Sequence, residues 1–122
     1  MTEIINLTPH ALRLRVEESN SAEPIESDIV LQPAGPAARV DQQSVVIGEV
    51  NDLPIKRAEF AEIENLPDPE DGVVYIVSML VAQRANRSDV MSPNTAPGQD
   101  IRYPADHKLK GLTFAVRGFQ QF

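Results

Sequence analysis

This chain has 122 residues, a formal net charge of −7, a hydrophobic share of 42% and no cysteine. The length fits a single domain, 1–122, and the composition is that of a globular protein. The lack of cysteine excludes disulfides, thiol nucleophiles and thiolate metal sites. No apolar run reaches the roughly 20 residues that span a bilayer, and the N-terminus MTEIINLTPH has no signal-peptide features. We therefore expect a cytoplasmic protein without membrane contact.

Short β-strands separated by polar or proline-containing turns are predicted in the first half of the chain. The first strand is predicted at 4–7, and the alternation of leucine and arginine at 12–16 predicts a half-exposed strand. The stretch at 17–27 is acidic and has no period, which is typical of a surface loop. Further strand patterns follow at 28–32, 39–40 and 45–47.

Residues 55–64 (IKRAEFAEIE) are compatible with two structures. Their residue types are good helix formers, whereas the turn that follows favours a strand leading into it. We predict a strand, because a bulge would bring Phe60 and Ile63 onto compatible faces.

The most informative part of the sequence begins with a turn at 66–72, built from prolines, acidic residues and a glycine. The apolar, β-branched run at 73–77 is typical of a strand that is buried on both faces. A short helix is predicted next, at about 79–86. Residues 92–110 are predicted to be mostly loop, and a last strand is predicted at 112–117.

These elements together predict a β-rich α+β fold with five to seven short strands and one short helix. We expect the strands at 73–77 and 112–117 to form a parallel pair through a right-handed crossover that contains the helix. The rest of the sheet is expected to be mostly antiparallel, because helical crossovers are otherwise scarce.

Ser78 lies where the buried strand meets the helix, and two roles are open for it. Its hydroxyl can cap the helix by accepting a hydrogen bond from the N–H of Leu80 or Val81. The same N–H groups can instead bind an anion. No glycine-rich loop precedes Ser78, so a phosphate-binding loop or a dinucleotide fingerprint is not predicted.

Arg84 and Arg87 lie three residues apart at the end of the predicted helix, and Asp89 follows closely. In one interpretation the two cations complement the carbonyl end of the helix, and Asp89 pairs locally with Arg87. In the other, Arg87 presents its planar guanidinium to a phosphate or carboxylate while Asp89 orients it.

His10 follows Thr8 and Pro9 after the first strand. A histidine in such a turn is either a general acid or base, or a turn residue that hydrogen-bonds to backbone. His10 and His107 lie far apart in the sequence, and the acidic residues at 68–71 lack the spacing of a calcium loop. The sequence therefore predicts no metal site and no cofactor.

Four short motifs give the chain a resemblance: NLTPH at 6–10, LPDP at 66–69, YIVS at 75–78 and RSDV at 87–90. In these patches, which are spread over most of the chain, it resembles a group of small bacteriophage and prophage proteins without an established activity. The resemblance implies phage or prophage origin. It also places six residues at recurring motif positions: Thr8, Pro9, His10, Ser78, Arg87 and Asp89. The long loop after residue 93 departs from the group.

Charge is distributed unevenly along the chain. Residues 1–72 carry fifteen acidic and five basic side chains, whereas residues 73–122 carry three acidic and six basic ones. One acidic surface and one mildly basic surface are therefore expected. Nucleic-acid binding is disfavoured, because basic residues are few and only six aromatic residues are present.

Three functional hypotheses follow, and catalysis is not the favoured one. The favoured hypothesis is a non-catalytic phage protein in the host bacterial cytosol that binds a host factor, for instance as an inhibitor of a host or defence protein, through Glu17, Glu18, Glu23 and Glu26. The alternative is a protein that binds a nucleotide or another phosphate ligand, with hydrolysis as an extension of that role, through Thr8, His10, Ser78, Arg84, Arg87 and Asp89. The third is a structural or assembly protein of the virion.

A homo-oligomer is also compatible with the sequence. A β-rich domain of this size has edge strands, and Phe114, Phe119 and Phe122 lie near the C-terminus. These phenylalanines either fold onto the core or form a contact with a second chain.

Overall fold

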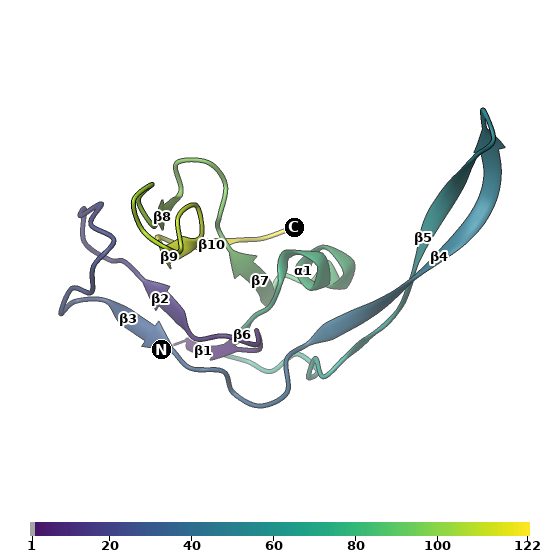
Figure 1. The fold of residues 1–122 in the computed structure, drawn as a ribbon. Coiled ribbons are helices and arrows are strands. Elements are labelled where there is room, and N and C mark those ends of the chain that lie inside the picture. Colours follow the sequence, from purple (N-terminus) through teal and green to yellow (C-terminus); the bar gives the residue numbers. More distant parts are fainter. Residues whose placement is uncertain (1) are drawn as a thin grey trace.

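The computed structural model describes residues 2–122 and contains ten strands and one helix in this range (Figure 1). Their bounds in chain order are β1 (Glu3–Asn6), β2 (Leu12–Leu14), β3 (Ile29–Leu31), β4 (Arg39–Val50), β5 (Leu53–Glu64), β6 (Val73–Ile76), α1 (Met79–Ala85), β7 (Val90–Pro93), β8 (Asp100–Arg102), β9 (Thr113–Val116) and β10 (Phe119–Gln120). The fold is thus β-rich with one short helix, as predicted.

The first sheet has the strand order β1-β6-β7-β10 and holds most of the core. Strands β1, β6 and β7 are parallel to one another, and β10 joins β7 in the antiparallel sense. Helix α1 connects β6 to β7 and packs its buried Val81 on the sheet. Ile76, Val77 and Val90 are almost completely buried, so the apolar run after the proline-rich turn forms the centre of the molecule.

The second sheet has the order β3-β2-β9-β8 and is mixed. Strands β3 and β8 lie antiparallel to their neighbours at the two edges, whereas β2 and β9 are parallel in the middle. Val116 of β9 aligns with Leu14 of β2, and the Arg15 N–H donates to the Val116 carbonyl at 2.9 Å. The C-terminal part of the chain is therefore fixed to its N-terminal part.

Strands β4 and β5 form a separate two-stranded hairpin, which we call the hairpin arm (residues 39–64). Figure 1 shows it extending away from both other sheets. Its two-residue turn, Asn51 and Asp52, has φ of 50° and 65°, which these short polar side chains tolerate. Only its base contacts the core, where Val40 and Ile63 pack against buried residues.

Two local predictions are confirmed by this structure. Residues 55–64 lie in strand β5, and the register shift at Val40 and Gln42 provides the bulge expected between Phe60 and Ile63. Helix α1 ends at Ala85, where Asn86 adopts the left-handed conformation with φ of 48°.

Three predictions about the sheets are wrong. Strand β6 does not pair with β9, because β1 and β7 occupy both of its edges; β9 pairs with β2 instead. The sheets are mixed rather than mostly antiparallel, and the number of strands exceeds five to seven. Strands of two to four residues, such as β8 and β10, contain too few positions for a period to be recognised.

The three C-terminal phenylalanines differ in their surroundings. Phe119 is half-buried in β10, opposite Pro93 of β7. Phe114 is half-buried in β9, with its ring edge-on to that of Tyr103 at 5.3 Å between centroids. Phe122 is exposed. Within residues 2–122, no helix is long and apolar enough to cross a membrane.

Candidate functional site

The loop that connects β2 to β3 contains the acidic residues singled out in the sequence, and it is built around one buried arginine. Arg15 directly follows β2, and Asp28 directly precedes β3. The antiparallel register pairs Leu14 with Ile29, so one further step along both strands places Arg15 opposite Asp28. Arg15 Nε donates to Asp28 Oδ1 at 2.6 Å, and Nη2 donates to Oδ2 at 3.3 Å. This is a two-point contact between planar groups.

The remaining donors of Arg15 bind the loop backbone. Nη1 donates to the carbonyl oxygens of Ser19 and Ser21 at 3.1 and 2.9 Å, and Nη2 donates to that of Glu23 at 2.9 Å. A buried guanidinium is tolerated only when its donors are paired, and here the loop wraps around it to supply the acceptors. Arg15 therefore specifies the loop conformation.

Asp28 is the anionic partner of this buried cation. Its carboxylate also accepts from the backbone N–H of Ile25 and from Arg13 Nη1, both at 3.1 Å. The Arg15 hydrogen bond lowers the pKa of Asp28 from 3.8 to about 2; desolvation opposes this shift, and the Ile25 and Arg13 hydrogen bonds reinforce it. The guanidinium carbons of Arg13 and Arg15 lie 5.2 and 5.9 Å from the ring centre of Phe114.

Arg117, which follows β9, holds the start of the loop from a second direction. Nη1 donates to the Glu17 carbonyl at 3.0 Å, and Nη2 donates to the Ser19 carbonyl at 2.8 Å and to Asn20 Oδ1 at 2.5 Å. The loop is thus fixed by two arginines that are about a hundred positions apart in the sequence.

The four glutamates of this fixed loop are exposed to solvent. All four are exposed, and none forms an ion pair with another part of residues 2–122: Glu17, Glu18, Glu23 and Glu26. Because the backbone that carries them is already ordered, a partner that binds here does not have to pay the full entropy of ordering the loop.

The organising role of Arg15 was not predicted. The alternation at 12–16 places Arg15 on the polar face and Val16 on the apolar face, yet Arg15 is 2% exposed and Val16 is 61% exposed. The reason is that β2 ends at Leu14, so a period of two does not extend to the next residues. The one feature of the sequence that indicates the Arg15–Asp28 pair is an arginine at the end of one strand followed by an aspartate at the start of the next.

Thr8 and His10, which were proposed for ligand binding, belong to a hydrogen-bond network around Asn6. The buried Asn6 side chain donates from Nδ2 to the carbonyl oxygens of His10 and Leu31, both at 2.9 Å, and its Oδ1 accepts from the Thr8 N–H at 2.9 Å. The Thr8 hydroxyl lies 2.7 Å from Asn6 Oδ1 and 2.9 Å from the His10 carbonyl oxygen. The NLTPH motif thus connects the ends of β1, β2 and β3.

The imidazole of His10 has a different environment from its backbone. It is exposed and lies at a hollow of about 320 Å³ that is also lined by Pro93 and Phe114. His10 therefore contributes its carbonyl oxygen to the Asn6 network while its ring remains available to solvent.

Ser78 caps helix α1. It has extended φ and ψ, and its hydroxyl oxygen accepts from the Val81 N–H at 3.5 Å. This confirms the capping role, which is one of the two roles that the sequence leaves open for Ser78. The helix has only seven residues.

Arg87 and Asp89 form a two-point ion pair. Arg87 Nε and Nη2 donate to the two carboxylate oxygens of Asp89 at 2.9 and 2.6 Å, and Nη1 donates to the Pro67 carbonyl at 3.1 Å. The Asp89 hydrogen bond raises the pKa of Arg87, and the same bond lowers the pKa of Asp89. Arg87 thereby fastens the 66–72 turn to the end of the helix.

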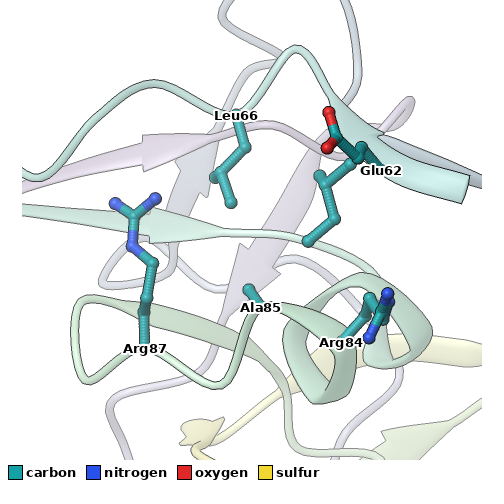
Figure 2. A pocket seen from close by; sticks show the side chains of 6 residues that line it. Glu62, Leu66, Arg84, Ala85 and Arg87 are labelled. Atoms are coloured by element: carbon teal, nitrogen blue, oxygen red, sulfur yellow. The ribbon is translucent and has the colours of Figure 1, made fainter.

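Arg84 and Arg87 line one hollow of about 340 Å³, shown in Figure 2, but their guanidinium groups do not converge. In Figure 2 they lie on different sides of Ala85 and point away from each other. The carboxylate of Glu62 lies at the same hollow. Among the described residues, 2–122, Arg84 forms no ion pair, so the hollow offers an anion this arginine together with the nearby carboxylate of Glu62.

The structure therefore distributes the residues proposed for ligand binding over three places: Thr8 and His10 at the turn after β1, Ser78 at the start of α1, and Arg84, Arg87 and Asp89 near its end. Within residues 2–122, no group of three or more histidine, aspartate or glutamate side chains is arranged to hold a metal ion.

The chain matched none of the protein-family models, curated proteins or solved structures with which it was compared.

Proposed function

We propose that this protein is a non-catalytic binding protein of phage or prophage origin, and that its acidic loop (residues 17–28) binds a basic surface of a host protein. The observation that carries this proposal is the pair of arginines, Arg15 and Arg117, that fix the loop from inside. The arginines bind backbone carbonyls and Asp28, so the exposed glutamates keep their charges for a partner.

The geometry of the other candidate residues also favours binding over catalysis. The polar groups of Thr8, Ser78 and Arg87 are engaged with neighbours in their own chain. Such bonds stabilise turns, a helix end and a loop. The exposed glutamates of the acidic loop, by contrast, form no ion pair within the described part of the chain, residues 2–122.

Electrostatics sets the expected behaviour of the complex. Complementary charge at the rim of an interface mainly accelerates association, and salt weakens this effect because the Debye length falls to about 3 Å at 1 M ionic strength. We therefore expect a complex that forms rapidly at low salt and weakly at high salt.

The test compares two fourfold variants of the full chain as immobilised bait for a bacterial lysate. One variant carries Glu→Gln at the four loop positions, Glu17, Glu18, Glu23 and Glu26. The control neutralises four exposed carboxylates elsewhere, at Glu3, Glu70, Asp71 and Asp106. Both variants have the same net charge, so only the position of the removed charge differs.

Under the proposal, the wild-type chain and the control capture the same host protein in low salt, and the loop variant does not. The captured protein is then purified, and its affinity for each variant is measured at two salt concentrations. A host protein that binds the loop variant as tightly as the wild-type chain would exclude the acidic loop as its binding site.

A further inference from the structure

The distal half of the hairpin arm exposes far more apolar surface than a solvated hairpin requires. Six aliphatic side chains between residues 45 and 55 are exposed there: Val45, Val46, Ile47, Val50, Leu53 and Ile55. Their exposed surface is on the order of 500 Å² in total and is divided between the two faces of the hairpin. Figure 1 shows this region extending into solvent, away from the two other sheets.

These side chains are sorted by the register of the hairpin. Val50 pairs with Leu53, and Gly48 pairs with Ile55, so these positions share one face. The shift between Val46 and Gly48 then returns Val45 to the same face. We call this set, Val45, Val50, Leu53 and Ile55, the apolar face.

The opposite face is more polar, and the edge of the arm resists strand addition. Val46 pairs with Lys56, and Glu49 pairs with Pro54, so both of these pairs include a charged residue; on the apolar face only Val45 has a charged partner, Arg57. A proline and a lysine along β5 also disfavour the pairing of another strand with its edge. A contact through the apolar face is therefore favoured over edge-to-edge pairing.

Gly48 lies at the centre of the apolar face and presents no side chain there. No atom lies within 4 Å of the position that a Cβ would occupy. Leu53, at 68% exposure, is the most exposed apolar side chain of the arm. The face therefore has one strongly projecting side chain, Leu53, and one position without a side chain, Gly48.

We propose that the hairpin arm is a dimerisation arm, in which the apolar faces of two copies of this chain pack antiparallel to each other. Charge supports a second copy as the occupant. The acidic tip residue Asp52 lies beyond one end of the apolar pair Leu53 and Ile55, and Arg57 lies beyond the other. A two-fold axis through the middle of this segment brings each Asp52 next to the Arg57 of the other copy.

The available area also fits a dimer of this kind. With the flanking charged side chains included, two facing arms bury on the order of 1,000 Å², which is about where specific interfaces begin. The acidic loop lies on the opposite side of the molecule in Figure 1, between β2 and β3, so dimerisation leaves it accessible. The dimer and the proposed binding of a host protein therefore use separate surfaces, and each can be refuted without the other.

The experiment measures the association state of the full chain by sedimentation velocity from about 5 to about 200 µM. Two variants introduce the same charge on opposite faces of the arm, Leu53→Glu on the apolar face and Val46→Glu on the other. Both positions are well exposed, at 68% and 59%, so neither substitution removes a buried core contact. Circular dichroism spectra and melting curves that match the wild-type monomer verify that each variant is folded.

The proposal expects a concentration-dependent dimer for the wild-type chain and for Val46→Glu, and a monomer for Leu53→Glu. A second pair of variants tests the two-fold arrangement. Arg57→Glu places two carboxylates beside each other and weakens dimerisation by more than about tenfold. Adding Asp52→Asn to the same chain removes one of the two carboxylates and recovers part of the loss; asparagine also tolerates the φ of 65° at this position.

Three results would overturn the proposal. The first is a wild-type chain that remains monomeric at the highest concentration, which would exclude a second copy of this chain as the partner of the arm. The second is equal loss of association in Val46→Glu and Leu53→Glu. The third is an Asp52→Asn/Arg57→Glu chain that associates no better than Arg57→Glu alone.

Discussion

Replacing Arg15 with methionine removes the one group that holds the acidic loop from inside. Methionine resembles the aliphatic part of the arginine side chain, but it donates none of the five hydrogen bonds that Arg15 makes to Asp28 and to three loop carbonyls. Asp28 keeps its charge in a buried position and loses its main partner. We expect the free energy of unfolding to fall by about 3–5 kcal/mol, the usual cost of breaking a buried ion pair on one side.

For a chain of this length, that loss corresponds to a fall in melting temperature of about 10–20 °C. Thermal and urea unfolding followed by circular dichroism measure it. Arg13→Met is the matched control, because Arg13 makes one hydrogen bond to Asp28 from a side chain that is 26% exposed. We expect that variant to lose about 1 kcal/mol or less. Equal losses for the two variants, or a loss below about 1 kcal/mol for Arg15→Met, would refute the role assigned to Arg15.

Three further predictions concern single polar groups. Because the pKa of Asp28 is lowered from 3.8 to about 2, its stabilising effect is present above about pH 4 and is lost as the pH falls toward 2. In urea unfolding across this range, the free energy of unfolding should fall more steeply with decreasing pH for the wild-type chain than for Asp28→Asn. Parallel curves for the two proteins would contradict this. Ser78→Ala should cost about 0.5–1 kcal/mol, at the low end for a helix cap because the bond is long, whereas exposed Ser88→Ala should be neutral. Arg87→Met should raise the pKa of Asp89, measured by NMR titration, because the Arg87 hydrogen bond is the main cause of its lowering; an unchanged pKa would show that another group is responsible.

The sequence predicted those features that depend on residues close together in the chain. The cap at Ser78 and the end of α1 depend on hydrogen bonds within one or two helical turns, and local residue chemistry specifies such bonds. Residues 55–64 were assigned correctly as a strand, against their helix-favouring composition, because the adjacent turn constrains the chain. The exposure of the four loop glutamates also followed from local polarity.

Features that depend on distant residues were not predictable in the same way. The residue pattern alone does not show which strand pairs with β6, because β1 and β9 both have apolar patterns suited to that position. Thr8 and Ser78 both belong to short motifs at the end of a strand, yet Thr8 binds Asn6 and Ser78 caps a helix. The burial of Arg15 was not predicted, because the alternation of inward and outward side chains ends with strand β2 at Leu14.

The parallel pairing of β1 with β6 has a consequence for how the chain folds during its synthesis. Glu3 aligns with Val73, so the first strand leaves the ribosome roughly 70 residues before its partner, a wait of about 4–14 s at elongation rates of about 5–20 residues per second. Throughout that time, β1 and its Asn6 have no central strand on which to dock. The hairpin arm contains only neighbouring residues and can close within microseconds of its emergence. The arm should therefore form first, and the core should assemble around β6 only after most of the chain has been made.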